Sequence, residues 1–147
     1  MQDHEQLISA ALGGSAAAQF ELGRMYEEGI NLPQSYQEAI RWYRLAAETD
    51  KGWSTDAPFR LGHLYEQGFG VPTNFSEAAR WYLLSMQSPD GPPEDAERFV
   101  SLLQRGLVPP TIEAEYYIWK ARFESPSQGS GASGITTEVL GDEGLAQ

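Results

Sequence analysis

One stretch of the sequence occurs twice. Residues 22–43, LGRMYEEGINLPQSYQEAIRWY, return 39 positions later at residues 61–82 as LGHLYEQGFGVPTNFSEAARWY, and the two copies align without a gap. A copied unit of this size is one supersecondary element that cannot bury its apolar face alone, so its copies stack on one another. The repetition therefore constrains the chain to a solenoid.

Each copy is predicted to contain two helices. Apolar residues recur at helical spacing between Ala18 and Tyr26, and Gly29 suits the left-handed residue that ends many helices. The second helix opens with a capping box, in which Ser35 or Asn74 accepts a backbone N–H and a glutamate three residues later bonds back to the cap's own amide. The predicted fold class is all-α, a short solenoid of helix-turn-helix repeats.

Small residues are expected to let the paired helices approach closely. Gly23 and Gly62 stand at the same place in the two copies. Trp42 and Trp81, also equivalent, are expected to fill the remaining space as buried core anchors.

Weaker copies flank the two complete ones. In the last copy, Val100 continues the spacing of 39 from Leu61, and Tyr117 matches Trp81 at a spacing of 36. After residue 124 the Gly/Ser-rich stretch SPSQGSGASG predicts a flexible linker followed by a tail, together residues 125–147. The expected repeat domain covers residues 1–124, with a cap helix at 4–12 and repeats at 15–48, 56–87 and, in degenerate form, 93–124.

The repeated motifs resemble those of a known family. L-G-x-x-Y-x-x-G, a proline-containing turn and E-A-x-R-W-Y are similar to the Sel-1-like repeat, a relative of the tetratricopeptide repeat, over about Leu7 to Glu124. The resemblance implies a scaffold or adaptor without common catalytic residues. A secreted, disulfide-rich branch of that family has been given a penicillin-binding or hydrolytic activity, but this chain has no cysteine and departs from that branch.

Composition restricts the partners. The chain has 10 basic and 21 acidic residues, a net charge of −11, whereas nucleic acids and anionic membranes reward positive charge. Neither is expected as a partner, and a basic protein is permitted. The first twelve residues have neither the charge pattern of a signal peptide nor the length of a membrane span. A cytoplasmic location is therefore expected, and a mature form whose signal has been removed stays open.

The sequence lacks recognisable catalytic and metal-binding patterns. The two histidines, His4 and His63, have no partner at metal-ligand spacing. No H-E-x-x-H, G-x-S-x-G or phosphate-binding glycine loop occurs. Accordingly, no catalytic residue, cofactor or metal is predicted.

The first candidate surface for a partner protein lies on the first helix of each copy. One aromatic and two polar or charged residues per copy point away from the Leu22 face, toward the wall that is concave in such solenoids. These residues are Phe20, Arg24, Glu27, Phe59, His63 and Glu66. For the two phenylalanines, packing between adjacent repeats is the favoured alternative to partner contact.

The second candidate surface is a stripe on the expected last helix, Thr111 to Glu124. The inward face is expected to carry Ala114, Tyr117, Ile118 and Ala121. The opposite, outer stripe is Ile112, Tyr116, Trp119 and Phe123. Because no further repeat follows, this stripe is expected to be covered by the tail, by a second copy in a homodimer, or by another protein. The tail offers Ile135, Val139 and Leu140.

The function predicted from these features is a non-catalytic adaptor or scaffold that binds a partner protein. A specific inhibitor, immunity protein or secretion accessory for one partner is the alternative. A hydrolase like that of the cysteine-rich branch is the least favoured interpretation.

Overall fold

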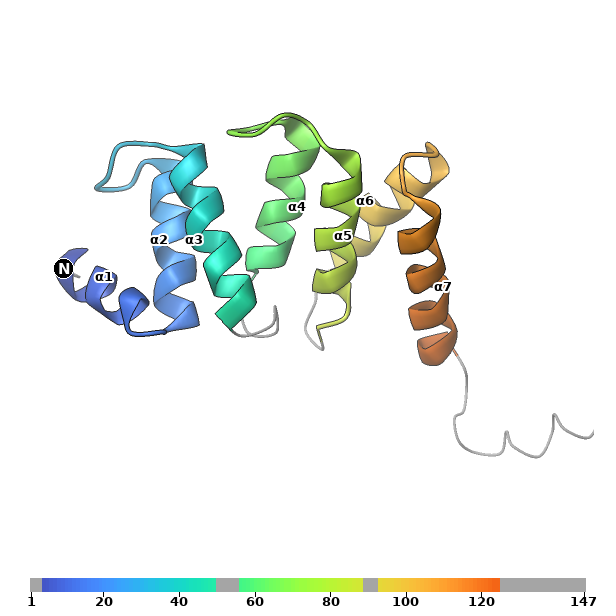
Figure 1. The fold of residues 1–147 in the computed structure, drawn as a ribbon, viewed down its shortest axis with the longest axis horizontal. Coiled ribbons are helices and arrows are strands. Elements are labelled where there is room, and N and C mark those ends of the chain that lie inside the picture. The colour runs from blue at the N-terminus through green and yellow to red at the C-terminus, as the bar shows by residue number, and fades with distance from the viewer. Residues whose placement is uncertain (1–3, 50–55, 89–92, 125–147) are drawn as a thin grey trace, which may run out of the picture. The chain divides into compact units, whose positions relative to one another are not determined.

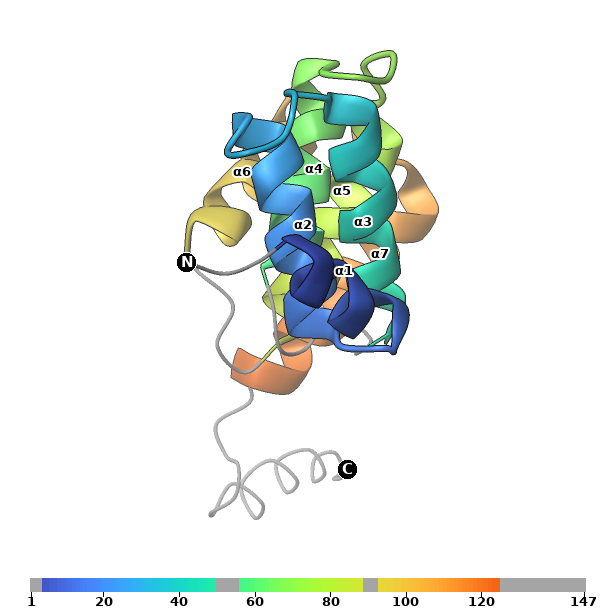
Figure 2. The ribbon, with the colours of Figure 1, turned by 90° about the vertical axis from the view of Figure 1, so that its left-hand side faces the viewer.

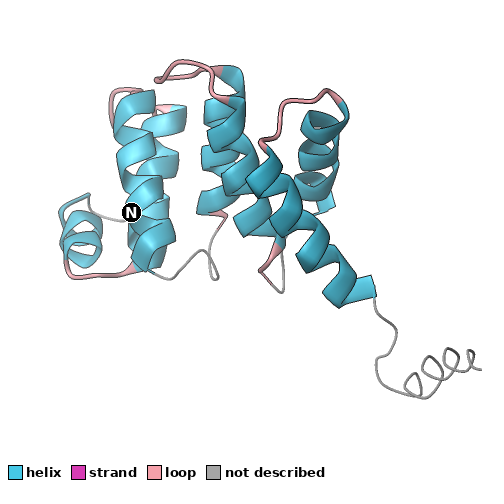
Figure 3. Cartoon of the chain, turned by 45° about the vertical axis from the view of Figure 1, so that its right-hand side comes forward, coloured by secondary structure: helices cyan, strands magenta, loops and turns pink. Residues whose placement is uncertain are grey.

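The computed structural model describes residues 4–49, 56–88 and 93–124, and every regular element in these ranges is a helix (Figure 1, Figure 3). The helices are α1 His4–Leu12, α2 Ala16–Glu28, α3 Tyr36–Thr49, α4 Ala57–Gln67, α5 Phe75–Met86, α6 Pro93–Gln104 and α7 Pro110–Glu124. The all-α class predicted from the repeats is confirmed. Two compact units form, Met1–Ile112 with α1 to α6, and Glu113–Gln147 with most of α7.

In the first unit, the copied stretches form two helical hairpins. α2 packs on α3, and α4 packs on α5. Contacts between α3 and α4 join the hairpins, while α1 packs on α2 and α6 packs on α5. Figure 2 views the chain from the α1 side, with α2 and α3 behind α1. Each hairpin thus buries its apolar face against its neighbours.

The second helices begin where the sequence places them. Ser35 Oγ accepts the backbone N–H of Glu38 at 3.2 Å, one residue before α3. Asn74 Oδ1 accepts the backbone N–H of Glu77 at 3.0 Å, one residue before α5. The predicted caps are confirmed.

The other half of each capping box does not form as predicted. The backbone N–H of Ser35 donates to the carbonyl of Tyr26 at 2.9 Å, and that of Asn74 donates to the carbonyl of Tyr65 at 3.0 Å. Both acceptors lie in the last turn of the preceding helix, which the tight hairpin turn brings close. The glutamates are therefore not needed to satisfy the cap amides.

Removing a cap gives a prediction of moderate size. Ser35→Ala is expected to lower the free energy of unfolding by about 1 kcal/mol, because a backbone N–H at the start of α3 loses its acceptor. Glu38→Ala is the matched control: it removes only an exposed ion pair with Arg41, worth less than about 0.5 kcal/mol. Urea denaturation measures both losses. Equal losses would contradict the assigned cap.

Two tyrosines occupy the space between the helices of each hairpin. Tyr43 and Tyr82 are both fully buried. A Cβ added to Gly23 would lie 2.5 Å from Cδ1 of Tyr43, and one added to Gly62 would lie 2.6 Å from Cδ1 of Tyr82. The glycines predicted to allow close approach therefore do so, and what approaches them is a tyrosine ring.

The prediction that Trp42 and Trp81 are buried core anchors is wrong. Both are half-buried, and the guanidinium of Arg44 lies 5.9 Å from the ring centre of Trp81. Each tryptophan precedes a core tyrosine by one position. One step along a helix turns a side chain by about 100°, which moves it from the hairpin interior to its edge.

The third copy has a different register from the one predicted. Gly106 follows α6 with a left-handed φ of 72°, and it stands 38 positions after Gly68, whose φ is 74°. Phe99 is fully buried, 38 positions after the buried Leu61. The predicted match of Val100 with Leu61 is therefore wrong by one residue.

Candidate functional site

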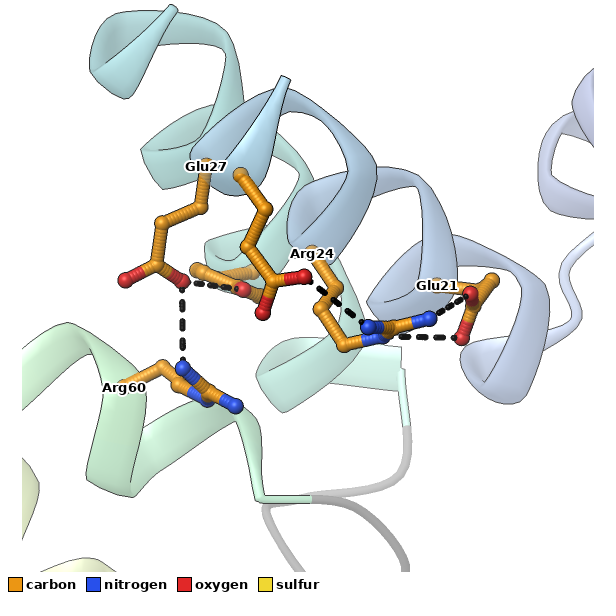
Figure 4. Close-up of polar contacts among 6 residues, drawn as sticks. Glu21, Arg24, Glu27 and Arg60 are labelled. Atoms are coloured by element: carbon orange, nitrogen blue, oxygen red, sulfur yellow. Dashed lines mark hydrogen bonds and ion pairs between the residues drawn. The ribbon is translucent and has the colours of Figure 1, made fainter. Parts of the chain in front are cut away.

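The first-helix residue Glu27 belongs to a polar cluster that joins three helices. The hydroxyl of Tyr43 donates to Glu27 Oε1 at 2.6 Å, and Arg60 Nη1 lies 3.5 Å from the same oxygen (Figure 4). The three residues come from α2, α3 and α4, and the glutamate side chain is only 13% exposed. One carboxylate thus ties a hairpin together and joins it to the next repeat.

A second cluster repeats this geometry one copy later. Tyr82 donates its hydroxyl to Glu66 Oε1 at 2.6 Å, and Arg98 Nη1 lies 3.5 Å from that oxygen. Burial, and next the hydrogen bond to the carboxylate, raise the pKa of Tyr82 far above its ordinary value. The same causes raise the pKa of Tyr43, so both hydroxyls remain donors. Glu27 and Glu66 were predicted to contact a partner. In the structure they hold together the helices that form the first-helix wall, which consists of α2, α4 and α6.

Arg24 and His63 stand at equivalent positions in different surroundings. Arg24 forms ion pairs along α2 with Glu21 at 2.6 Å and Glu28 at 3.1 Å, and the hydrogen bond with Glu21 is the main cause that raises its pKa (Figure 4). His63 is half-buried, and this burial is the main cause that lowers its pKa. The wall therefore presents a fixed positive charge at one position and a neutral imidazole at neutral pH at the other.

Phe20 and Phe59 pack on the core tyrosines. The ring centroids of Phe20 and Tyr43 are 5.5 Å apart, and those of Phe59 and Tyr82 are 6.0 Å apart. In each case the partner ring belongs to the same hairpin, and the predicted packing between adjacent repeats stays a prediction. Both phenylalanines are half-buried, which leaves part of each ring on the wall.

Two arginines of this site were missed by sequence reasoning. Arg60 and Arg98 complete the polar clusters from the next first helix. They stand 38 positions apart, the true spacing of the second and third copies. The predicted spacing of 39 aligns Arg98 with Phe59 and not with Arg60, so the two arginines were not recognised as equivalent.

On α7, the predicted outer stripe is largely the buried side. Ile112 and Tyr116 are 2% and 6% exposed, so these two residues of the predicted outer stripe are covered. Trp119 is half-buried, with its ring centroid 6.1 Å from that of Tyr116. The side chain of Phe123 lies outside the described residues.

The predicted inward face of α7 is the exposed one. Tyr117 and Ile118 are 50% and 60% exposed. The error follows from the repeat register: Tyr116 is buried like Tyr43 and Tyr82, and it stands 34 positions after Tyr82. The predicted spacing of 36 placed Tyr117 at an inward position instead.

Two shallow hollows lined by described residues of the first unit bear on partner binding. One of about 330 Å³ is lined by Ala96, Glu97, Val100, Ser101 and Gln104 of α6. At the spacing of 38, Ser101 and Gln104 are the equivalents of His63 and Glu66, so this hollow continues the first-helix wall. The other, of about 400 Å³, is lined by Leu12, Ile40, Arg41, Trp42, Arg44, Leu45 and Glu48.

No group of three or more metal-ligating His, Asp or Glu side chains is found within residues 4–49, 56–88 and 93–124. In the same part of the chain, no helix combines the length and the apolar character needed to cross a membrane.

Comparison with known families matches the two hairpins. Residues 16–49 and 55–85 each match the model of the Sel1 repeat. These segments contain α2 with α3, and α4 with α5. No relative is found among the curated proteins.

Solved structures are similar over most of the chain. A Sel1 repeat protein from Oxalobacter formigenes is 31% identical with a TM-score of 0.64, over 80% of this chain and 48% of that protein. c5321, a protective antigen present in uropathogenic Escherichia coli strains and displaying an SLR fold, is 28% identical with a TM-score of 0.64. That match covers 83% of this chain and 26% of the antigen. The chain therefore spans less than half the length of either protein.

Proposed function

Because the chain carries two Sel1 repeats, a helical unit common in protein-interaction modules, we propose that it is a non-catalytic module that binds a segment of a partner protein. The proposed surface is the first-helix wall of α2, α4 and α6. Its members are Phe20, Arg24, Phe59, Arg60, His63, Arg98, Ser101 and Gln104.

The observation that carries this proposal is the repeated polar cluster. Glu27 holds α4 beside α2, and Glu66 holds α6 beside α4, with the same carboxylate-to-guanidinium distance of 3.5 Å. Successive first helices are thereby fixed in a regular row. A surface ordered before binding loses less conformational entropy when a partner arrives.

The wall offers charged and apolar contacts side by side. The side chains of Arg24, Arg60 and Arg98 are 34%, 33% and 38% exposed, so a partner's carbonyls or carboxylates can reach their N–H groups. The half-exposed phenylalanine rings and the hollow on α6 suit apolar side chains. The net charge of −11 favours encounter with a basic protein. An extended or helical segment carrying both kinds of group fits this wall.

Site-specific photocrosslinking identifies the partner and tests the surface together. A benzophenone side chain replacing Arg24 or Ser101 on the wall is expected to capture a protein in cells of the source organism. The same group replacing Arg80, a 60% exposed side chain on α5, is expected to capture none of it. Equal capture from all three positions would contradict a binding surface on the wall.

Affinity for the captured protein then gives a matched comparison. Arg24→Glu is expected to weaken binding by about tenfold, equivalent to about 1.4 kcal/mol. Arg41→Glu is the control, because Arg41 forms the same i,i+3 pair with a glutamate but lies on α3, beside the second hollow. Calorimetric titration and melting temperatures measure both variants. Loss of binding in Arg41→Glu alone would contradict the wall and favour that hollow.

A further inference from the structure

The exposed face of α7 is an apolar stripe. Tyr117 and Ile118 are 50% and 60% exposed, and Ala114 and Ala121 are exposed as well. Their spacing of i, i+3, i+4 and i+7 places all four on one face of the helix. Large apolar side chains gathered in this way generally mark a surface that another segment covers.

The repeat register shows what covers the position of Tyr117 in the complete copies. Tyr117 stands 34 positions after Leu83, which in turn stands 39 after Arg44. Arg44 bonds the hydroxyl of Tyr65 on α4, the first helix of the next repeat. Leu83 is 3% exposed on α5, which packs on α6, again the next first helix. Tyr117 therefore stands at a position that faces the next first helix in the complete copies.

We propose that residues 135–147 of the same chain dock on this stripe. The segment has 13 residues, as many as α2, and it carries the apolar residues Ile135, Val139 and Leu140. Residues 125–134 connect it to α7, and a linker of this length gives an effective concentration on the order of millimolar.

Charge is complementary between the segment and the end of α7. The segment contains Glu138, Asp142 and Glu143 and no lysine or arginine. The last turns of α7 carry two basic residues, Lys120 and Arg122, and one acidic residue, Glu124. Opposite charges at this end of the helix favour docking of the acidic segment and fix its orientation.

A second copy stacked head to tail would not bring a first helix to α7. At the other end of the repeats, α1 matches a second helix, since its buried Ala11 corresponds to the buried Ala47 of α3. Both α1 and α7 therefore correspond to second helices. Stacking of copies would place two second helices together, which is not how the solenoid continues.

A spin label on the segment tests the proposal in the full chain. The protein has no native cysteine, so Gly141→Cys provides a single labelling site. The label is expected to abolish the amide signals of Tyr117, Ile118 and Ala121 in nitrogen-15 spectra, and reduction with ascorbate is expected to restore them. Leu140→Asp in the labelled chain is expected to prevent this loss. Leu12→Asp, which alters an apolar side chain on α1 that is 73% exposed, is expected to leave the loss intact.

Mixing experiments distinguish the occupant. When spin-labelled chains without nitrogen-15 are mixed with unlabelled nitrogen-15 chains, the α7 signals are expected to persist, because docking occurs within one chain. Loss of signals in the mixture would show that a second copy occupies the stripe and would overturn the proposal. Persistence of the signals in the singly labelled chain would overturn it as well. Neither measurement requires the binding partner. The outcome therefore does not depend on whether a partner binds the first-helix wall.

Discussion

Tyr43→Ala is expected to lower the free energy of unfolding by about 4 kcal/mol. The ring is fully buried against the backbone of Gly23, and its centroid lies 5.5 Å from that of Phe20, so the substitution leaves a cavity of aromatic size. It also removes the hydroxyl that donates to Glu27, a carboxylate that is only 13% exposed. Equilibrium urea unfolding followed by circular dichroism measures the loss.

Two companion variants separate the causes of this loss. Tyr43→Phe keeps the ring and removes only the hydrogen bond to Glu27, and is expected to cost about 2 kcal/mol. Trp42→Ala removes a half-buried aromatic one position earlier, and is expected to cost about half as much as Tyr43→Ala. A larger loss for Trp42→Ala than for Tyr43→Ala would contradict the tyrosine as the core anchor.

The repeat, and the residues that begin and end its helices, could be predicted from the sequence because they depend on local chemistry. A gapless copy fixes two equivalent hairpins, whatever their detailed packing. Ser35 and Asn74 cap helices through their own side chains, and Gly29 and Gly68 take left-handed backbone angles. Each of these features is decided within a few residues, so the sequence pattern carries it directly.

The identity of the buried aromatic could not be decided in the same way. Tryptophan and tyrosine are adjacent in both copies, at Trp42–Tyr43 and Trp81–Tyr82, and both residue types suit a helix interface. The deciding contact is tertiary: a glycine on the facing helix meets the tyrosine ring. Only the relative rotation of the two helices selects one neighbour over the other.

Register caused the remaining errors, including those at the candidate surfaces. The third copy keeps few of the motif residues, so alignment relied on small residues such as Ala114 and Ala121. The better markers are Gly106, Arg98 and Tyr116, which repeat a left-handed helix end, an inter-repeat ion pair and a buried tyrosine. These residues are equivalent in backbone angle, charge pairing and burial. Identical residue types at a fixed spacing do not reveal these properties.

Gly62→Ala is expected to lower the free energy of unfolding by about 2 to 3 kcal/mol, although alanine favours helix over glycine by about 1 kcal/mol. The new Cβ would stand 2.6 Å from both Cδ1 and Cε1 of Tyr82. The ring has little room to move, because it is fully buried and its hydroxyl is bonded to Glu66. Chemical denaturation of the variant and the parent protein measures the difference.

A double-mutant cycle with Tyr82→Leu assigns that loss to one contact. In the Tyr82→Leu background the smaller side chain leaves room for a Cβ, so Gly62→Ala is expected to cost little or to stabilise the protein. Additive losses would instead mean that the backbone of α4 requires glycine. Gly62 is not among the residues with positive φ, whereas Gly68 is, with a φ of 74°. Gly62 is therefore needed for the tyrosine ring that it faces, and Gly68 for the turn that it forms.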